Sequence, residues 1–177
     1  MKITKVLLVL MLLVLMADGY AQTIQFGYNG HVAIHPGIES RLTFNLKDSL
    51  SAKNLRLFVG SSITYFGQRD VHRSLLYQGV VGVRKPGKTS HALFLGLGFL
   101  SESELIEGTI DLGPGNRLSE DRLVRNFFVP QLGYELSRQI NPKLGWYTRS
   151  SFGYRYSGTS QRRMVLFIGF GIQYYLK

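Results

Sequence analysis

The sequence contains four histidines, the side chains best suited to bind a metal or transfer a proton near neutral pH: His31, His35, His72 and His91. His31 and His35 are four positions apart, but the Pro36-Gly37 pair that follows them disfavours a helix. Without a helix, this spacing does not place both rings on one face. The chain has no cysteine, which excludes thiolate metal sites and disulfides. We therefore expect no metal and no cofactor.

A lipid hydrolase would need a serine, a histidine and an acid close together. His72 and Ser74 share one face of a predicted strand, and Asp70 is close in the sequence. Ser90 and His91 are adjacent and point to opposite faces, so they cannot form such a pair. The sequence has no Gly-x-Ser-x-Gly elbow, phosphate loop or dinucleotide fingerprint. We expect no catalytic site, and the alternative is a lipid hydrolase that uses His72 and Ser74.

Charged residues recur among the apolar runs, and two glutamates stand among several arginines. Glu39 and Glu135 could form a general acid and base pair. Neighbouring arginines would keep both ionised, which suits ion pairing better than proton transfer. We predict one ion-paired network from six residues: Glu39, Arg41, Arg56, Glu135, Arg149 and Arg155. A polar pore for small ions is the other interpretation.

The elements that position these residues are eight apolar or alternating runs, separated by Gly, Pro, Asn, Asp and Ser clusters. The runs are 22–30, 36–47, 53–66, 71–85, 88–103, 122–139, 142–157 and 161–177. Several alternate with period 2, and none has a convincing helical period. In the last run, Leu166, Ile168 and Phe170 share one face, whereas Gly169 and Gly171 share the other. This pattern predicts antiparallel strands with two different faces.

The position of glycine indicates which face is inside. With the apolar face fixed in each run, almost every strand glycine falls on the opposite face, and only Gly79 breaks the rule. Glycine weakens a strand that faces solvent, but it fits the crowded interior of a small barrel. We therefore predict an all-β, eight-stranded antiparallel up-and-down transmembrane barrel with its apolar face toward lipid and its polar face toward the lumen.

The N-terminal segment 1–21 has the plan of a cleaved secretory signal peptide. Lys2 and Lys5 precede an apolar run from Val6 to Met16, which is too short to span a bilayer as a helix. The barrel domain is then 22–177. The chain carries a net charge of +10. For an exported protein, we expect this charge to face anionic lipid, either phospholipid or lipopolysaccharide, and not nucleic acid.

Connection lengths and lysines predict the orientation. The short links 48–52, 86–87 and 140–141 would be periplasmic turns, and the long link 104–121 an extracellular loop. The lysines of 22–177 all fall at the short links or the C-terminus: Lys47, Lys53, Lys85, Lys88, Lys143 and Lys177. Both termini would then be periplasmic. Pro130 lies within a predicted strand, so we expect a bulge there, or a strand whose first half rises above the membrane.

Arginines gather near the predicted extracellular end, where they could bind lipopolysaccharide phosphates: Arg122, Arg125, Arg162 and Arg163. The alternative is an ordinary rim in which these arginines pair with the acids of the long link, Glu102 among them. The loop 104–121 is also a candidate site for a protein partner.

The eight aromatic-rich runs and a final strand reading Met-Val-Leu-Phe-Ile-Gly-Phe-Gly-Ile-Gln-Tyr-Tyr-Leu-Lys resemble the small outer-membrane β-barrel proteins of the Bacteroidetes type. This resemblance implies a Gram-negative outer-membrane protein. From the ion-paired network we expect a closed polar lumen, and we expect a structural or accessory role. Because such barrels include adhesins, enzymes and structural proteins, the resemblance does not assign one function. Besides the hydrolase, a soluble periplasmic barrel that carries an apolar ligand remains an alternative.

Overall fold

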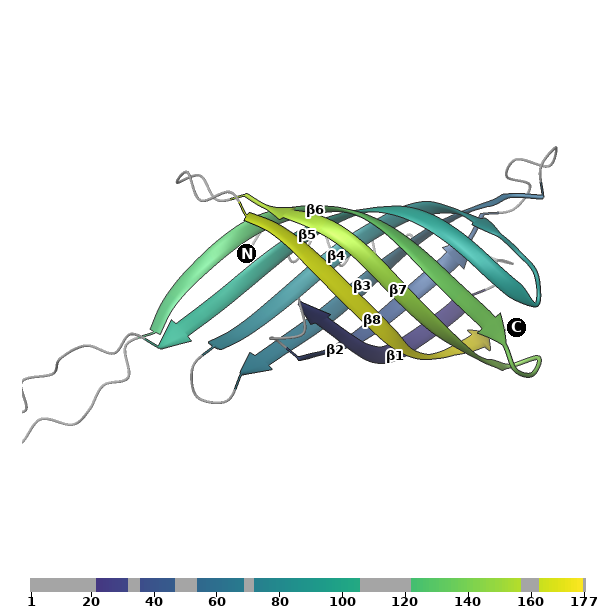
Figure 1. Ribbon diagram of the computed structural model, residues 1–177, viewed down its shortest axis with the longest axis horizontal. Coiled ribbons are helices and arrows are strands. Elements are labelled where there is room, and N and C mark those ends of the chain that lie inside the picture. Colours follow the sequence, from purple (N-terminus) through teal and green to yellow (C-terminus); the bar gives the residue numbers. More distant parts are fainter. Residues whose placement is uncertain are drawn as a thin grey trace, which may run out of the picture.

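The computed structural model describes residues 22–31, 36–46, 54–68, 72–105, 122–156 and 163–176. Eight antiparallel strands pair in sequence order and close into a barrel (Figure 1). The strands are β1 (Gln22–His31), β2 (Gly37–Asn45), β3 (Arg56–Gln68), β4 (His72–Lys85), β5 (Thr89–Leu105), β6 (Arg122–Gln139), β7 (Leu144–Arg155) and β8 (Arg163–Leu176). Each predicted run corresponds to one strand, although β1, β3 and β5 extend past their runs to His31, Gln68 and Leu105. The predicted fold is therefore confirmed, whereas segment 1–21 lies outside the described residues.

The two ends of the barrel follow from this topology. Gln22 pairs with Leu176, so β1 begins where β8 ends. We call this the terminal end; it also carries the connections 46–55, 86–88 and 140–143. The opposite loop end carries the connections 32–36, 69–71, 106–121 and 156–162. Connection 46–55 is longer than the turn expected at 48–52, because β2 ends earlier and β3 begins later than predicted.

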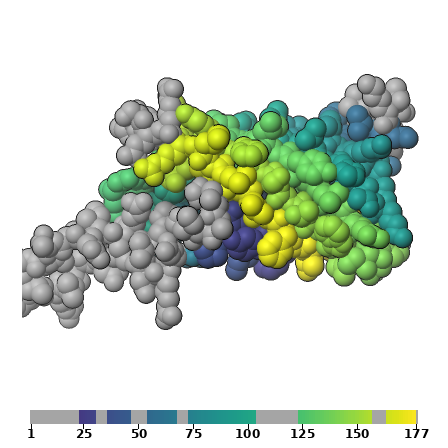
Figure 2. Space-filling model, viewed as in Figure 1, coloured from purple at the N-terminus to yellow at the C-terminus, as the bar shows by residue number. Residues whose placement is uncertain are grey.

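The barrel is apolar outside and largely polar inside. On β5, Leu93, Leu95 and Leu97 expose 56%, 57% and 62% of their surface, and the residues between them point inward. Gly79 also points outward, because a Cβ built there meets no atom within 4 Å. A soluble protein would bury these leucines, whereas a transmembrane barrel turns them to lipid. Figure 2 shows β6, β7 and β8 forming one continuous outer face.

Aromatic side chains stand on the outer surface at two levels. Tyr134, Trp146 and Tyr174 lie toward the terminal end, and Tyr65 and Tyr154 lie toward the loop end, all partly exposed. From Trp146 to Tyr154, β7 rises about 26 Å along its own direction, or about 20 Å across a membrane for a tilt of about 40°. Two aromatic levels that flank an apolar band are typical of transmembrane barrels. The described residues include no helix long and apolar enough to cross a membrane.

Pro130 produces no bulge. The β5–β6 register is continuous through Leu97↔Pro130. On the other side, the β6–β7 ladder stops at Gln131 and continues in the same register as a bridge from Phe128 to Tyr156. Phe128 donates its N–H to Tyr156 O at 3.0 Å, so the missing N–H of Pro130 also falls on the β7 side. The bulge prediction was wrong, because no residue is inserted and only the hydrogen bond that a proline nitrogen cannot donate is missing. At the left of Figure 1, β5 and β6 reach past their neighbours.

Candidate functional site: the charged and apolar layers of the lumen

A guanidinium group bridges two buried carboxylates at the centre of the barrel. On β7, Arg149 Nη1 contacts both carboxylate oxygens of Glu39 on β2, at 2.7 and 2.8 Å. Its Nη2 contacts Glu135 Oε2 on β6 at 2.8 Å. The three residues expose 4% or less of their surface. Because β2 and β7 are not neighbours in the sheet, this bridge crosses the lumen.

Two more arginines complete the cluster. Arg41 Nε lies 3.1 Å from Glu39 Oε1, and Arg84 Nη2 lies 3.2 Å from Glu135 Oε1. The cluster therefore sets three guanidinium groups against two carboxylates. Aromatic faces offset the excess positive charge, since Arg41 lies 4.9 Å from the ring centre of Phe94.

Amide side chains hold the carboxylates from their remaining sides. Gln25 Nε2 donates to Glu135 Oε1 at 2.9 Å, and Asn29 Nδ2 donates to Glu39 Oε2 at 2.7 Å. Both amides come from β1, beside the seam where β1 pairs with β8. Buried charges are tolerated when they are paired and hydrogen-bonded in this way. A carboxylate with this many charged donors is a poor proton carrier, which favours a structural role over acid–base catalysis.

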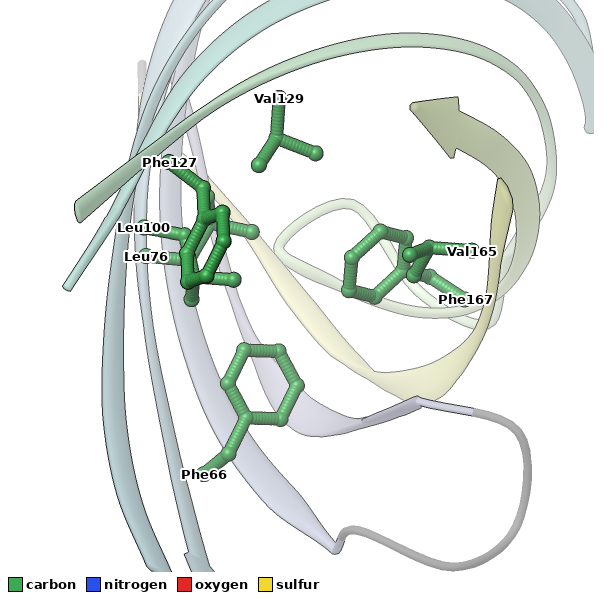
Figure 3. Packing of buried hydrophobic residues seen from close by; sticks show 7 residues of the cluster. All are labelled: Phe66, Leu76, Leu100, Phe127, Val129, Val165 and Phe167. Carbon is green, nitrogen blue, oxygen red and sulfur yellow. The ribbon is translucent and has the colours of Figure 1, made fainter. Parts of the chain in front are cut away.

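An apolar layer occupies the lumen on the loop-end side of this cluster. It consists of Phe66, Leu76, Leu100, Phe127, Val129, Val165 and Phe167 (Figure 3). The rings of Phe66 on β3 and Phe167 on β8 meet at 6.0 Å, so the layer extends between strands that are not paired. The inside of the barrel is therefore not polar along its whole length, because this apolar layer lies beside the predicted charged residues. Several of these residues alternate with other apolar residues, so the sequence pattern did not show which of them faced inward.

A smaller apolar layer lies toward the terminal end, formed by Phe58, Val80, Ala92 and Phe94. Arg84 lies over the Phe58 ring at 4.7 Å, and this joins the layer to the charged cluster. The inside of the barrel thus alternates between apolar and charged layers along its axis. We call the whole arrangement the lumen plug.

The structure brings four of the six predicted network residues together: Glu39, Arg41, Glu135 and Arg149. Arg56 has the inward phase of β3 but lies exposed at its first residue, away from the cluster. Arg155 forms a separate ion pair with Glu102 near the loop end. Arg84 joins the cluster without having been predicted, although its inward phase follows from the alternation of β4.

The Arg155–Glu102 pair lies at the mouth of the loop end. Arg155 stacks over the ring of Phe127 at 4.3 Å, so the pair rests on the apolar layer. In the β-sheet register, Arg155 stands opposite Arg163, and Glu102 stands opposite Arg125. Glu102 was expected among the acids of the long link, but it lies within β5 and exposes 5% of its surface.

The predicted phosphate-binding arginines fall at this same end. Arg125 and Arg163 are exposed on β6 and β8. Arg122 begins β6, but its side chain is outside the described part of the chain, as is Arg162 altogether. Residues 106–121 of the predicted partner-binding loop are also outside it, while 104–105 end β5.

The structure describes only part of the alternative hydrolase site. Ser74 is 4% exposed and faces the lumen, opposite Glu102 on β5. His72 begins β4, and its side chain is outside the described residues, as is Asp70. The serine is therefore turned away from the outer surface that meets lipid.

No family model and no curated protein matches the chain. It is similar in structure to a major outer membrane protein of Thermus thermophilus, with 11% identity, a TM-score of 0.61 and coverage of 90% of this chain and 100% of that one. Neisserial surface protein A gives 11% identity, a TM-score of 0.52 and coverage of 89% and 96%. The outer membrane enzyme PagL gives 14% identity, a TM-score of 0.51 and coverage of 87% and 98%. At these identities the likeness is one of fold, and the fold is that of small outer-membrane β-barrels.

Proposed function

We propose that this chain is an integral protein of the Gram-negative outer membrane with a structural or accessory role. Its lumen is closed to ions, both termini are periplasmic, and an extracellular arginine rim binds lipopolysaccharide phosphates. The observation that carries the membrane placement is the reversed polarity of the barrel. Leu93, Leu95 and Leu97 point outward, whereas Glu39 and Arg149 are buried inside.

Membrane fractionation with a heat-modifiability gel tests the placement. We expect the protein in the membrane fraction, with an unboiled band that shifts on boiling, because a closed barrel resists detergent. Recovery in the aqueous fraction without detergent would instead support the soluble periplasmic carrier.

The lumen plug supports a closed barrel, because ionic and aromatic side chains reach across the lumen between strands that are not neighbours in the sheet. In planar bilayers, we expect no single-channel steps from the purified protein. Regular conductance steps from a preparation that is fully folded on the gel would contradict a closed lumen.

The arginine rim is tested by lipopolysaccharide co-purification. Replacing Arg122, Arg125, Arg162 and Arg163 with Gln should reduce the bound lipopolysaccharide, because guanidinium groups bind phosphate oxygens in pairs. Arg56→Gln is the matched control, since Arg56 is exposed at the opposite end. Equal lipopolysaccharide on the variant and the wild type would exclude the rim.

The lipid hydrolase is less well supported. One similar structure is an enzyme, but Ser74 of this chain faces the lumen. A lipid-extract assay of wild type against His72→Ala decides the matter. We expect no hydrolysis from either, and activity that is lost in the variant would favour the enzyme.

A further inference from the structure

The outer surface at the terminal end carries its described cations on one sector of the barrel, from β4 to the β6–β7 turn. Four basic residues are exposed there: Lys85, Lys88, Arg138 and Lys143. On β1, β2 and β8, the described outward positions near this end are apolar or aromatic, with Tyr174 as an example. Among the described residues, the outward-facing positive charge at this end is therefore concentrated on one side, whereas Arg56, also exposed here, has the inward phase of β3.

The register places the basic side chains around a histidine. Lys85 ends β4 and stands opposite His91 on β5, which in turn stands opposite Leu136 on β6. Arg138 is the next outward residue of β6 and stands opposite Trp146 on β7. His91 Nδ1 lies 2.5 Å from the hydroxyl oxygen of Tyr134, which holds the imidazole against the β6 side.

A backbone contact brings the β4–β5 turn to the same place. Gln139 donates its N–H to Lys88 O at 3.0 Å, so Lys88 lies beside the end of β6. The sector thus combines two lysines, one arginine and one imidazole within three neighbouring strands. We call Lys85, Lys88, His91 and Arg138 the basic sector.

No protein carboxylate neutralises these cations within the residues that the structure describes. The carboxylates with described side chains are Glu39, Glu102 and Glu135, and all are buried inside the barrel. No ion pair involves Lys85, Lys88 or Arg138 in that same set of residues. Like charges on adjacent strands repel, so a negative partner from outside the chain would stabilise them.

An apolar surface continues from the basic sector toward the middle of the barrel. Leu93 and Leu95 follow His91 on the same face of β5, and Leu132 precedes Tyr134 on the same face of β6. Leu93 and Leu132 expose 56% and 59% of their surface. A ligand that fits both parts has an anionic head and a long apolar tail.

We infer that the basic sector is a binding site for an anionic phospholipid in the leaflet at the terminal end. The lipid phosphate lies between Lys85 and Arg138, and an acyl chain lies along Leu93, Leu95 and Leu132. This inference rests on the proposed membrane function, because the leucines are open to an acyl chain only when they face lipid. Each basic side chain near a membrane surface contributes about 1 kcal/mol toward an anionic lipid.

Native mass spectrometry of the detergent-solubilised protein tests the site, with phosphatidylglycerol and phosphatidylcholine of matched acyl chains as probes. We expect the wild type to retain phosphatidylglycerol preferentially. The Lys85→Gln/Arg138→Gln variant should bind it about thirtyfold more weakly, which corresponds to about 2 kcal/mol. Excess inorganic phosphate should leave most of the lipid bound, because the acyl chains add to binding.

The matched control is Arg73→Gln, which removes an exposed arginine from the loop end of β4. It should change phosphatidylglycerol binding by less than about twofold, because an exposed charge at the other end does not contact this leaflet. Three results would overturn the site: unchanged binding by the double variant, an equal loss in Arg73→Gln, or complete displacement of the lipid by inorganic phosphate.

The heat-modifiability gel separates this inference from the proposed function. If the wild-type protein gives no shifted band, the proposed membrane placement is wrong. If the wild-type protein folds and gives the shifted band but binds both lipids equally, only the lipid-binding role of the basic sector is wrong.

Discussion

At the scale of single residues, Arg149 forms the bridge of the buried charge cluster. Its guanidinium group holds Glu39 and Glu135 together across the lumen. A buried ion pair adds little net stability, but removing Arg149 is costly, because the buried carboxylates lose charged donors even though Arg41 and Arg84 still pair with them. Replacing Arg149 should therefore destabilise the fold by more than the ion pairs of Arg149 stabilise it.

Arg149→Met should lower the free energy of unfolding by about 3–5 kcal/mol. Combining it with Glu39→Gln and Arg41→Met should recover part of this loss, because position 39 then needs no charged partner and Glu135 keeps its ion pair with Arg84. The measurement is urea unfolding in phospholipid vesicles, followed by the fluorescence of Trp146, the single tryptophan. Arg56→Gln, an exposed arginine, should change stability by less than about 0.5 kcal/mol. A loss in the triple variant as large as in Arg149→Met would contradict the charge argument.

At the scale of elements, the seam between β1 and β8 depends on glycines that allow close packing. A Cβ built on Gly27 would lie 2.6 Å from Gly171 Cα and 2.8 Å from the Tyr147 hydroxyl oxygen. Gly27 and Gly171 stand opposite each other, and Tyr147 on β7 packs over them from inside. Since β1 and β8 close the barrel, a side chain at this point would strain its closure.

Gly27→Ala should therefore destabilise the barrel by about 1–3 kcal/mol through overpacking. Gly79→Ala is the matched control, because it is also a strand glycine but points into open space. There, alanine should be neutral or stabilising by up to about 1 kcal/mol, because glycine weakens a strand. The same unfolding assay measures both, and equal effects would show that the seam has no special packing requirement.

At the scale of the whole molecule, the surrounding lipid is expected to decide which substitutions are tolerated. Leu95 and Thr89 are exposed on the same outward face of β5, but Thr89 begins the strand and Leu95 lies well inside it. The cost of a charge on the lipid face depends on depth and is greatest at the midplane.

Leu95→Arg should cost about 2–4 kcal/mol in unfolding from vesicles, and Thr89→Arg about 0–1 kcal/mol. Equal costs at the two depths would argue against a bilayer around the barrel. A soluble barrel in particular would tolerate arginine well at both positions, because both side chains are exposed.

The sequence was sufficient to predict the strands and their faces. The alternation of Leu166, Ile168 and Phe170 with glycine assigned the outer face of β8, and the structure exposes Ile168 and Phe170 on that face. The inward-facing residues of the loop-end apolar layer were not predicted. Both faces of those runs are apolar, so period-2 alternation does not distinguish the inner face from the outer one. At Pro130 the expected bulge was wrong, because the register runs past it without an inserted residue. The other expectation, a strand whose first half rises above the membrane, stays a prediction.

By itself, the sequence determined that the chain forms amphipathic strands, because alternation is a local property of the backbone. It also placed Glu39, Arg41, Glu135 and Arg149 on the inward face. Only the tertiary structure decided which charges meet, since strand ends and the stagger between strands set the height of each side chain. For this reason Arg84 joins the cluster, Arg155 pairs with Glu102, and Arg56 lies exposed at the terminal end.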